Sequence, residues 1–242
     1  MPSMKTPAKY LSSLMLALLV SACATQPPVV QTQSNVVMTK VAQEKITPDM
    51  ALALLKQGNE RFVNGSLLKR DLKSQVQISG KQGQYPFASV VSCIDSRTPP
   101  AVVFDQGIGD IFTASVAGNI VNEDILGSLE YAAKVAGSKV IVVLGHSHCG
   151  AVKGACDDVK MGNLTQLIAK ISPAVKATPN VDSSDRSSKN GHFVEEVAEM
   201  NVKMTVKAVT EKSSVLREMA EKGQIKIVGA MLDVETGKIT FE

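Results

Sequence analysis

Two apolar runs that each end in a cysteine-bearing polar loop constrain this chain more than any other feature of its sequence. The run 87–91 leads into the loop 93–97 (Cys-Ile-Asp-Ser-Arg), and the run 140–144 leads into the loop 145–149 (Gly-His-Ser-His-Cys). Uninterrupted apolar runs of this length are typical of buried strands in a parallel sheet. Ligands bind beyond the carboxyl ends of such strands, so we expect the two loops to form one site.

The two loops carry the donor atoms of a metal site. Cys93, His146 and Cys149 offer two sulfurs and an imidazole, a set found at catalytic zinc sites that keep a fourth position open. Asp95 can fill that position or point away from it, toward Arg97. A Cys93–Cys149 disulfide and buried thiols that only pack are the alternatives. We favour one zinc ion per chain, because the two strand ends supply matched ligand types.

The same residues carry a family resemblance. Cys-x-Asp-x-Arg followed by His-x-x-Cys-Gly resembles the β-class carbonic anhydrases, and the likeness extends over residues 47–241. It includes the segments 58–62, 92–99, 116–119, 145–151 and 233–237. The resemblance implies reversible hydration of carbon dioxide to bicarbonate and a proton, with zinc-bound hydroxide as the nucleophile.

Asp95 and Arg97 are the candidate catalytic residues beside the ligands. Two thiolates would offset the charge of the zinc ion, so the activated water needs a further helper. We expect Asp95 to accept the hydrogen bond of that water while Arg97 keeps the carboxylate ionised and turned from the metal. His148 either shuttles protons or faces solvent.

The resemblance also implies a substrate pocket and an assembly. The positions that match the pocket of the family are Gln84, Phe112, Ala117, Tyr131 and Gly150. In the family, part of this pocket comes from a second subunit, so a homodimer or a dimer of dimers is implied. Members that bind inhibitory bicarbonate beside the zinc use a Trp, an Arg and a Tyr. This chain has Val90, Ser115 and Leu232 at those places, so we expect no bicarbonate switch and a stable Asp95–Arg97 pair.

Two other functions remain open on the same residues. Some close relatives in the family hydrolyse carbonyl sulfide or carbon disulfide with the same ligands, and the difference lies in pocket access. A non-catalytic zinc-binding lipoprotein is the third reading, although zinc storage needs no Asp95–Arg97 pair.

The first 46 residues read as an export signal and a tether. Lys5 and Lys9 precede the apolar stretch 11–20, which is too short to span a bilayer, and the segment 20–23 (Val-Ser-Ala-Cys) resembles a bacterial lipobox. We expect a lipoprotein signal over residues 1–22 and lipid on Cys23, with an uncleaved anchor or a plain signal as alternatives. Ala24 then implies the periplasmic side of the outer membrane. Residues 23–46, rich in Gln, Thr and Ser, read as a flexible tether.

Residues 47–242 read as one catalytic α/β domain. Strands are predicted near 87–91, 110–116, 139–144, 225–232 and 239–241, with helices from Thr47, over 122–136, 163–175 and 193–211, and from Ser214. This order implies a mostly parallel central sheet flanked by helices, with an antiparallel C-terminal edge strand.

Charge and cysteine count exclude some classes of partner. Removal of residues 1–22 takes away two lysines and no acid, which lowers the formal charge of +3 by two. Such a balance gives no reason to expect nucleic acid, and the lipid would be the sole membrane contact. With Cys23 lipidated and two cysteines on zinc, Cys156 is left over as a spectator, so a disulfide framework is not expected.

Overall fold

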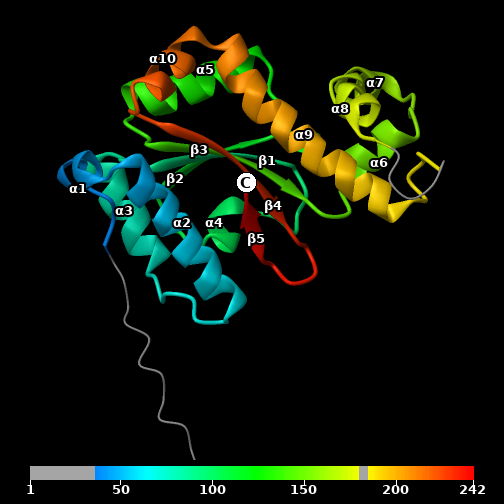
Figure 1. Cartoon of the computed structure of the whole chain (residues 1–242). Coiled ribbons are helices and arrows are strands. Elements are labelled where there is room, and N and C mark those ends of the chain that lie inside the picture. Colours follow the sequence, from blue (N-terminus) through cyan, green and yellow to red (C-terminus); the bar gives the residue numbers. More distant parts are fainter. Residues whose placement is uncertain (1–35, 180–184) are drawn as a thin grey trace, which may run out of the picture. The chain divides into compact units, whose positions relative to one another are not determined.

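A five-stranded, mostly parallel sheet forms the centre of the part of the chain that the structure describes. The computed structural model describes residues 36–179 and 185–242, and within them the strand order is β2-β1-β3-β4-β5 (Figure 1). The strands are β1 (Ala88–Ser92), β2 (Ile111–Ser115), β3 (Val140–His146), β4 (Lys226–Leu232) and β5 (Ile239–Phe241). The first four are parallel, and β5 pairs antiparallel with β4 at the edge. This confirms the predicted fold class.

The central strands are apolar because both faces of the sheet are covered. Every residue of β1 and of β3 is buried. Val90 packs with Leu55 on one face, and its neighbour Val91 packs with Leu129 on the other. A strand that is buried on both sides needs apolar residues at successive positions, which is why no alternation is visible in these runs.

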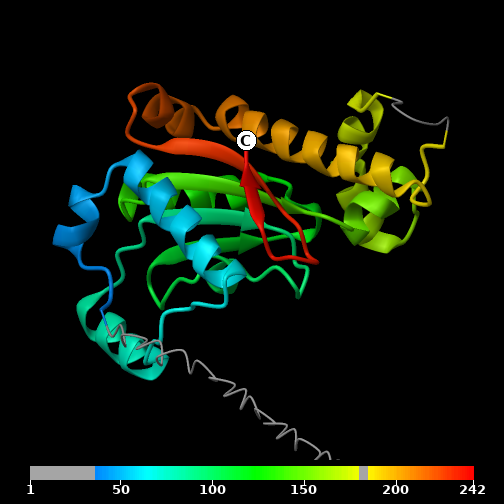
Figure 2. The ribbon, with the colours of Figure 1, turned by 60° about the horizontal axis from the view of Figure 1, so that its bottom comes forward.

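Helices cover both faces of the sheet. α2 (Pro48–Val63) and α4 (Pro100–Val103) lie on one face, and α5 (Glu123–Glu130), α9 (Gly191–Lys212) and α10 (Ser214–Glu221) lie on the other (Figures 1 and 2). Beyond the carboxyl ends of the strands, α6 (Gly150–Cys156), α7 (Gly162–Ala169) and α8 (Ser172–Ala177) pack against the first turns of α9. The remaining elements are α1 (Lys40–Lys45), α3 (Leu72–Gln82), the 3₁₀ turn η1 (Ala117–Asn119) and the π turn η2 (Tyr131–Val135).

Side-chain caps explain where two predicted helices begin. The Thr47 hydroxyl accepts the N–H of Met50 at 3.2 Å, and the Asn122 side chain accepts the N–H of Ile125 at 3.0 Å. The single helix predicted over 163–175 is instead two helices, α7 and α8. Pro173 lies in the first turn of α8, where its missing N–H breaks no hydrogen bond but would break the ladder of a continuous helix.

The prediction of a flexible tether over residues 23–46 is wrong for its last residues. Residues 40–45 form α1, and Gln43 within it is buried. The Gln43 side-chain amide donates to the carbonyls of Pro86 at 2.7 Å and Ala136 at 2.8 Å, which lie just ahead of β1 and β3. The polar composition of the segment hid this contact, because a buried Gln is stable only where backbone acceptors meet its N–H groups.

The rest of the predicted N-terminal organisation lies outside the described residues. This holds for the signal over residues 1–22, for Cys23 and for the tether up to residue 35. Within residues 36–179 and 185–242, no helix combines the length and the apolar character that crossing a membrane requires.

A buried carboxylate ties α2 to the two loops beside it. The Asp105 side chain is 3% exposed and accepts from Arg61 Nε at 2.5 Å and from the Leu68 N–H at 3.3 Å. It also pairs with Arg70, whose guanidinium donates to the Asp105 carbonyl at 2.6 Å. Removal of this carboxylate would leave two guanidinium groups, one of them nearly buried, without their counter-charge.

We expect Asp105→Ala to lower the free energy of unfolding by about 3 kcal/mol, since the loss of one partner strands the buried charges of the others. Chemical denaturation of the purified protein measures this difference. Glu211→Gln, which removes one member of an exposed pair with Lys207, is the matched control and should leave the midpoint almost unchanged. Equal stability of the Asp105→Ala protein and wild type would contradict the structural role of Asp105.

Candidate metal centre

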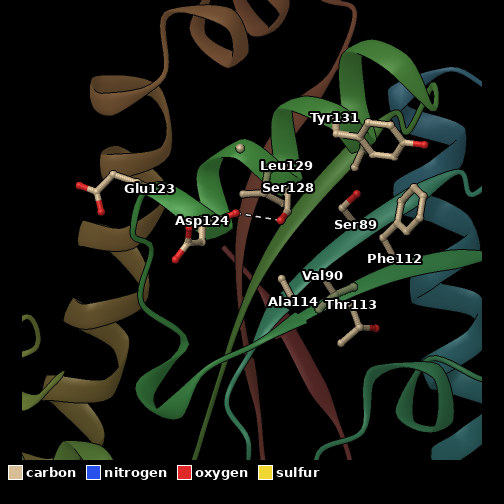
Figure 3. Close-up of a pocket in the computed structure, with 12 residues that line it drawn as sticks. Ser89, Val90, Phe112, Thr113, Ala114, Glu123, Asp124, Ser128, Leu129 and Tyr131 are labelled. Carbon is tan, nitrogen blue, oxygen red and sulfur yellow. Dashed lines mark hydrogen bonds between the residues drawn. The ribbon is translucent and has the colours of Figure 1, made fainter. Parts of the chain in front are cut away.

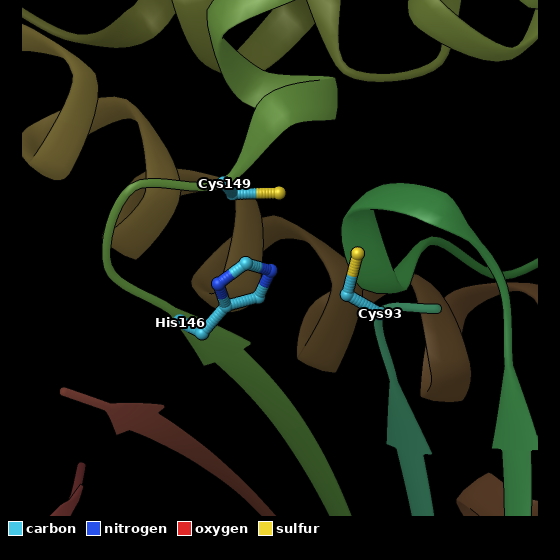
Figure 4. A group of neighbouring side chains, drawn as sticks. All are labelled: Cys93, His146 and Cys149. Carbon is cyan, nitrogen blue, oxygen red and sulfur yellow. The ribbon is translucent and has the colours of Figure 1, made fainter. Parts of the chain in front are cut away.

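Two adjacent strands bring the predicted ligands together. Cys93 directly follows β1, and His146 is the last residue of β3, which pairs with β1 in a register that sets Ser92 opposite Leu144. Cys149 immediately precedes α6. The ligand atoms of the three residues all lie within 4.8 Å of one another, and both sulfurs and the imidazole face the space between the strand ends (Figure 4). The convergence predicted from the two loops is confirmed.

The imidazole of His146 is held ready to bind a metal ion. Its Nδ1 lies 2.8 Å from the Ser147 carbonyl, a contact that places the proton on Nδ1. Nε2 is buried and has no hydrogen-bond partner among the described residues. A buried ring nitrogen without a partner is costly, and a metal ion would satisfy its lone pair. The residues present therefore fit zinc.

Both cysteines are free and differ in acidity. Cys93 and Cys149 form no disulfide in the structure, which removes that alternative. A hydrogen bond from Cys149 lowers the pKa of the Cys93 thiol against the effect of burial, and the Gly118 N–H, 3.4 Å from the Cys93 sulfur, acts in the same direction. The pKa of Cys149 is raised in turn by that hydrogen bond and by burial. The Gly118 N–H thus favours the thiolate form of Cys93, and a metal cation would favour ionisation of both thiols.

Asp95 lies beside the ligands but is bound to Arg97. The Arg97 guanidinium donates to the two carboxylate oxygens at 2.9 and 2.8 Å, and its backbone N–H donates at 2.9 Å. These hydrogen bonds hold the pKa of Asp95 well below its usual range. One Asp95 oxygen is 3.9 Å from His146 Nε2. The predicted pair is therefore present, and it forms because the loop turns after Asp95 rather than staying extended.

A cleft leads from the surface to Cys93 and Asp95. Its volume is about 460 Å³, and its wall includes Thr113 and Ser115 from β2 together with Pro99. A small neutral molecule can reach Cys93 and Asp95 through this opening. Ala117 and Gly150 also lie at this end of the sheet, where Ala117 begins the turn η1 and Gly150 begins α6.

Three predicted pocket residues lie at the other end of the sheet. Gln84 precedes β1, and Phe112 pairs with Ser89 at the beginning of that strand, four residues before Cys93. The rings of Phe112 and Tyr131 meet edge to face at 6.5 Å and line a separate cavity of about 610 Å³ (Figure 3). Within one chain, the structure does not bring these side chains to the metal ligands.

His148 points toward the surface on the far side of the loop. Its side chain is 46% exposed, and its ring nitrogens lie 3.7 Å from Glu195 and 3.5 Å from Glu235.

Sequence reasoning missed the Gly118 N–H that faces Cys93. No side-chain pattern reveals a backbone donor of this kind, because it depends on the positive φ of Gly118 (72°).

Comparisons with known proteins agree with this geometry. The family model described as carbonic anhydrase matches residues 88–239, from β1 into β5. Carbonic anhydrase 2 of Mycobacterium tuberculosis is 33% identical over 196 residues, which are 79% of this chain and 91% of that protein. A β-carbonic anhydrase of Aspergillus fumigatus superposes with a TM-score of 0.59 at 25% identity, over 80% of this chain and 89% of that one. A tetrameric β-carbonic anhydrase of Sordaria macrospora gives 0.58 at 25% identity, over 68% and 83%.

Replacement of Cys93 by Ser should abolish stoichiometric zinc binding, because a hydroxyl is a far weaker zinc ligand than a thiolate. Elemental analysis of the purified protein should find about one zinc per chain in wild type and almost none in Cys93→Ser. Cys156→Ser is the matched control, since Cys156 lies outside the cluster, and should keep its zinc. Full zinc content in Cys93→Ser would refute the ligand assignment.

Proposed function

This chain belongs to the family of β-class carbonic anhydrases, and we propose that it hydrates carbon dioxide reversibly to bicarbonate and a proton. We propose further that Cys93, His146 and Cys149 hold one zinc ion per chain. The observation that carries the proposal is the bidentate Asp95–Arg97 pair beside the three-ligand cluster, since it keeps Asp95 out of the ligand set. A metal that only stabilises the fold has no use for such a pair.

The residues around the cluster have separate tasks. Zinc supplies Lewis acidity that brings the pKa of water toward neutrality, as in the carbonic anhydrases with three-histidine sites. Asp95 is ionised and accepts a hydrogen bond from water in the cleft, which orients the water for attack on carbon dioxide. Arg97 holds that carboxylate in place through three hydrogen bonds. The Gly118 N–H stabilises the negative charge of Cys93.

The pocket is completed by a second copy of the chain under this proposal. Gln84, Phe112 and Tyr131 lie at the wrong end of the sheet to reach the ligands of their own chain. Tyr131 is 56% exposed, so it is free to meet another molecule. The Sordaria macrospora relative is described as tetrameric, which supports a homodimer or a dimer of dimers here. Light scattering on the zinc-loaded protein decides between a monomer and these assemblies.

Asp95→Asn should lower the rate of carbon dioxide hydration on the order of 100-fold at full zinc occupancy, because the neutral amide is a poorer acceptor for the proton of water. Stopped-flow measurement with a pH indicator gives this rate. Asp158→Asn, an exposed position with a φ of 48° that Asn tolerates, is the control and should match wild type. Carbonyl sulfide is assayed alongside, and its hydrolysis without carbon dioxide hydration would overturn the proposed substrate.

The same assay should find no cooperative inhibition by bicarbonate. Val90 and Leu232 are buried apolar residues, and the Ser115 hydroxyl is paired with the hydroxyl of Ser92 at 3.0 Å. None of them offers a cation that could hold bicarbonate and draw Asp95 from Arg97. Steep inhibition at rising bicarbonate would contradict this expectation.

We also propose that the enzyme is an exported lipoprotein on the periplasmic side of the envelope, on the strength of the segment 20–23. Radiolabelled palmitate should enter wild type and not Cys23→Ala, because the thiol of Cys23 is the attachment point. Equal labelling of the two proteins would exclude lipidation at Cys23. A protein that is exported but unlabelled would instead carry a plain cleaved signal or an uncleaved anchor.

A further inference from the structure

One helix contacts both halves of the metal site. α9 crosses the sheet and runs past the carboxyl ends of β1 and β3 (Figures 1 and 2). Near its beginning, the Glu195 carboxylate accepts the N–H of His148 at 2.9 Å. Farther along the helix, the Asn201 side-chain amide donates to the carbonyl of Gly118 at 2.8 Å. These contacts reach segments that lie 47 and 83 residues away in the sequence.

The contact of Asn201 fixes the turn that faces Cys93. Gly118 has a φ of 72°, and a Cβ there would lie 2.5 Å from Ile171 Cδ1, so the turn has one tight arrangement. Its N–H reaches the Cys93 sulfur while its carbonyl accepts from Asn201. Asn201 is 3% exposed, so water has little access to replace its amide. Loss of the amide would leave the buried Gly118 carbonyl without its partner and free the 118–119 peptide to rotate, which removes a restraint on the Gly118 backbone that carries the N–H.

The contact of Glu195 fixes the turn between the other two ligands. His148 lies between His146 and Cys149 and has a φ of 56°, a left-handed conformation that costs free energy for a residue other than glycine. Glu195 accepts the N–H of His148 in this conformation. On the other side of the turn, the Ser147 hydroxyl accepts the N–H of Val234 at 3.0 Å. The two acceptors hold the spacing between His146 and Cys149.

We propose that Asn201 and Glu195 are positioning residues and that α9 braces the two ligand segments against each other. Asn201 keeps the Gly118 N–H on Cys93, and Glu195 keeps the turn that carries His146 and Cys149. Neither residue belongs to the ligand group itself. The inference rests on the proposed zinc site, and it predicts that zinc is retained through contacts made outside the three ligands.

The rate of zinc release from the full zinc-loaded protein tests the brace. Asn201→Ala and Asn201→Leu both remove the amide donor. The Leu side chain also fills the volume of the Asn side chain, so this variant lacks the donor without leaving a cavity. Each should release zinc to a chromogenic chelator on the order of ten-fold faster than wild type. Glu195→Ala should also release zinc faster, by a smaller factor, whereas Glu195→Gln keeps an oxygen acceptor and should restore the wild-type rate.

Gln43→Leu is the matched control for a merely structural effect. It removes a buried side-chain amide that donates to two backbone carbonyls, but at the opposite end of β1 and β3. It should lower the melting temperature of the metal-free protein without changing zinc release. The cobalt-substituted proteins give a second measurement, since the thiolate-to-cobalt absorption should shift in the Asn201 variants and stay unchanged in Gln43→Leu.

The outcomes separate this inference from the proposed function. A wild-type protein that binds no zinc would overturn both. A wild-type protein that binds zinc, with release from the Asn201 and Glu195→Ala variants as slow as its own, would overturn the brace alone. Equal acceleration in Gln43→Leu would do the same, because the effect would then reflect general stability.

Discussion

The parallel pairing of β1 with β3 is the constraint on which the rest of the structure depends. Its register sets Ser92 opposite Leu144, so the residues that follow each strand enter the same space. A shift of this pairing by one residue would turn Cys93 or His146 to the other face of the sheet. The buried apolar residues of both strands disfavour such a shift. Each of their side chains would then face the helices on the opposite side of the sheet, where it does not fit the existing packing.

The fourth position of the cluster is decided by a competition for Asp95. Its carboxylate lies 3.9 Å from the ring nitrogen of His146, so it would lie beside a metal ion held by that ring. Arg97 prevents this by binding both carboxylate oxygens. Release of Asp95 would cost two charge-assisted hydrogen bonds in a partly covered cleft. The structure therefore holds a carboxylate next to the candidate metal site and on Arg97.

The sequence predicts the sheet and the ligand cluster because both follow from local signals. Apolar runs without alternation locate β1 and β3, and their polar ends locate Cys93, Asp95 and His146. Contacts between distant segments are not visible in this way. The burial of Gln43 depends on carbonyls ahead of β1 and β3.

The contacts of Asn201 and Glu195 with the ligand segments are hidden from the sequence for the same reason. The value of Asn201 to the site depends on the backbone conformation of a glycine 83 residues away. Likewise, the pocket positions that match the family, such as Phe112, look like one set in the sequence although one chain places them at two ends of the sheet. Residue type and spacing do not record at which end of the sheet a side chain lies.

A crystal structure of the zinc-loaded protein near neutral pH tests the central claim most directly. We predict zinc bound by the two sulfurs at about 2.3 Å and by the imidazole at about 2.0 Å, with solvent in the fourth position. Asp95 should remain on Arg97 in that structure. Zinc bound by Asp95, or zinc bound without one of Cys93, His146 and Cys149, would contradict this prediction.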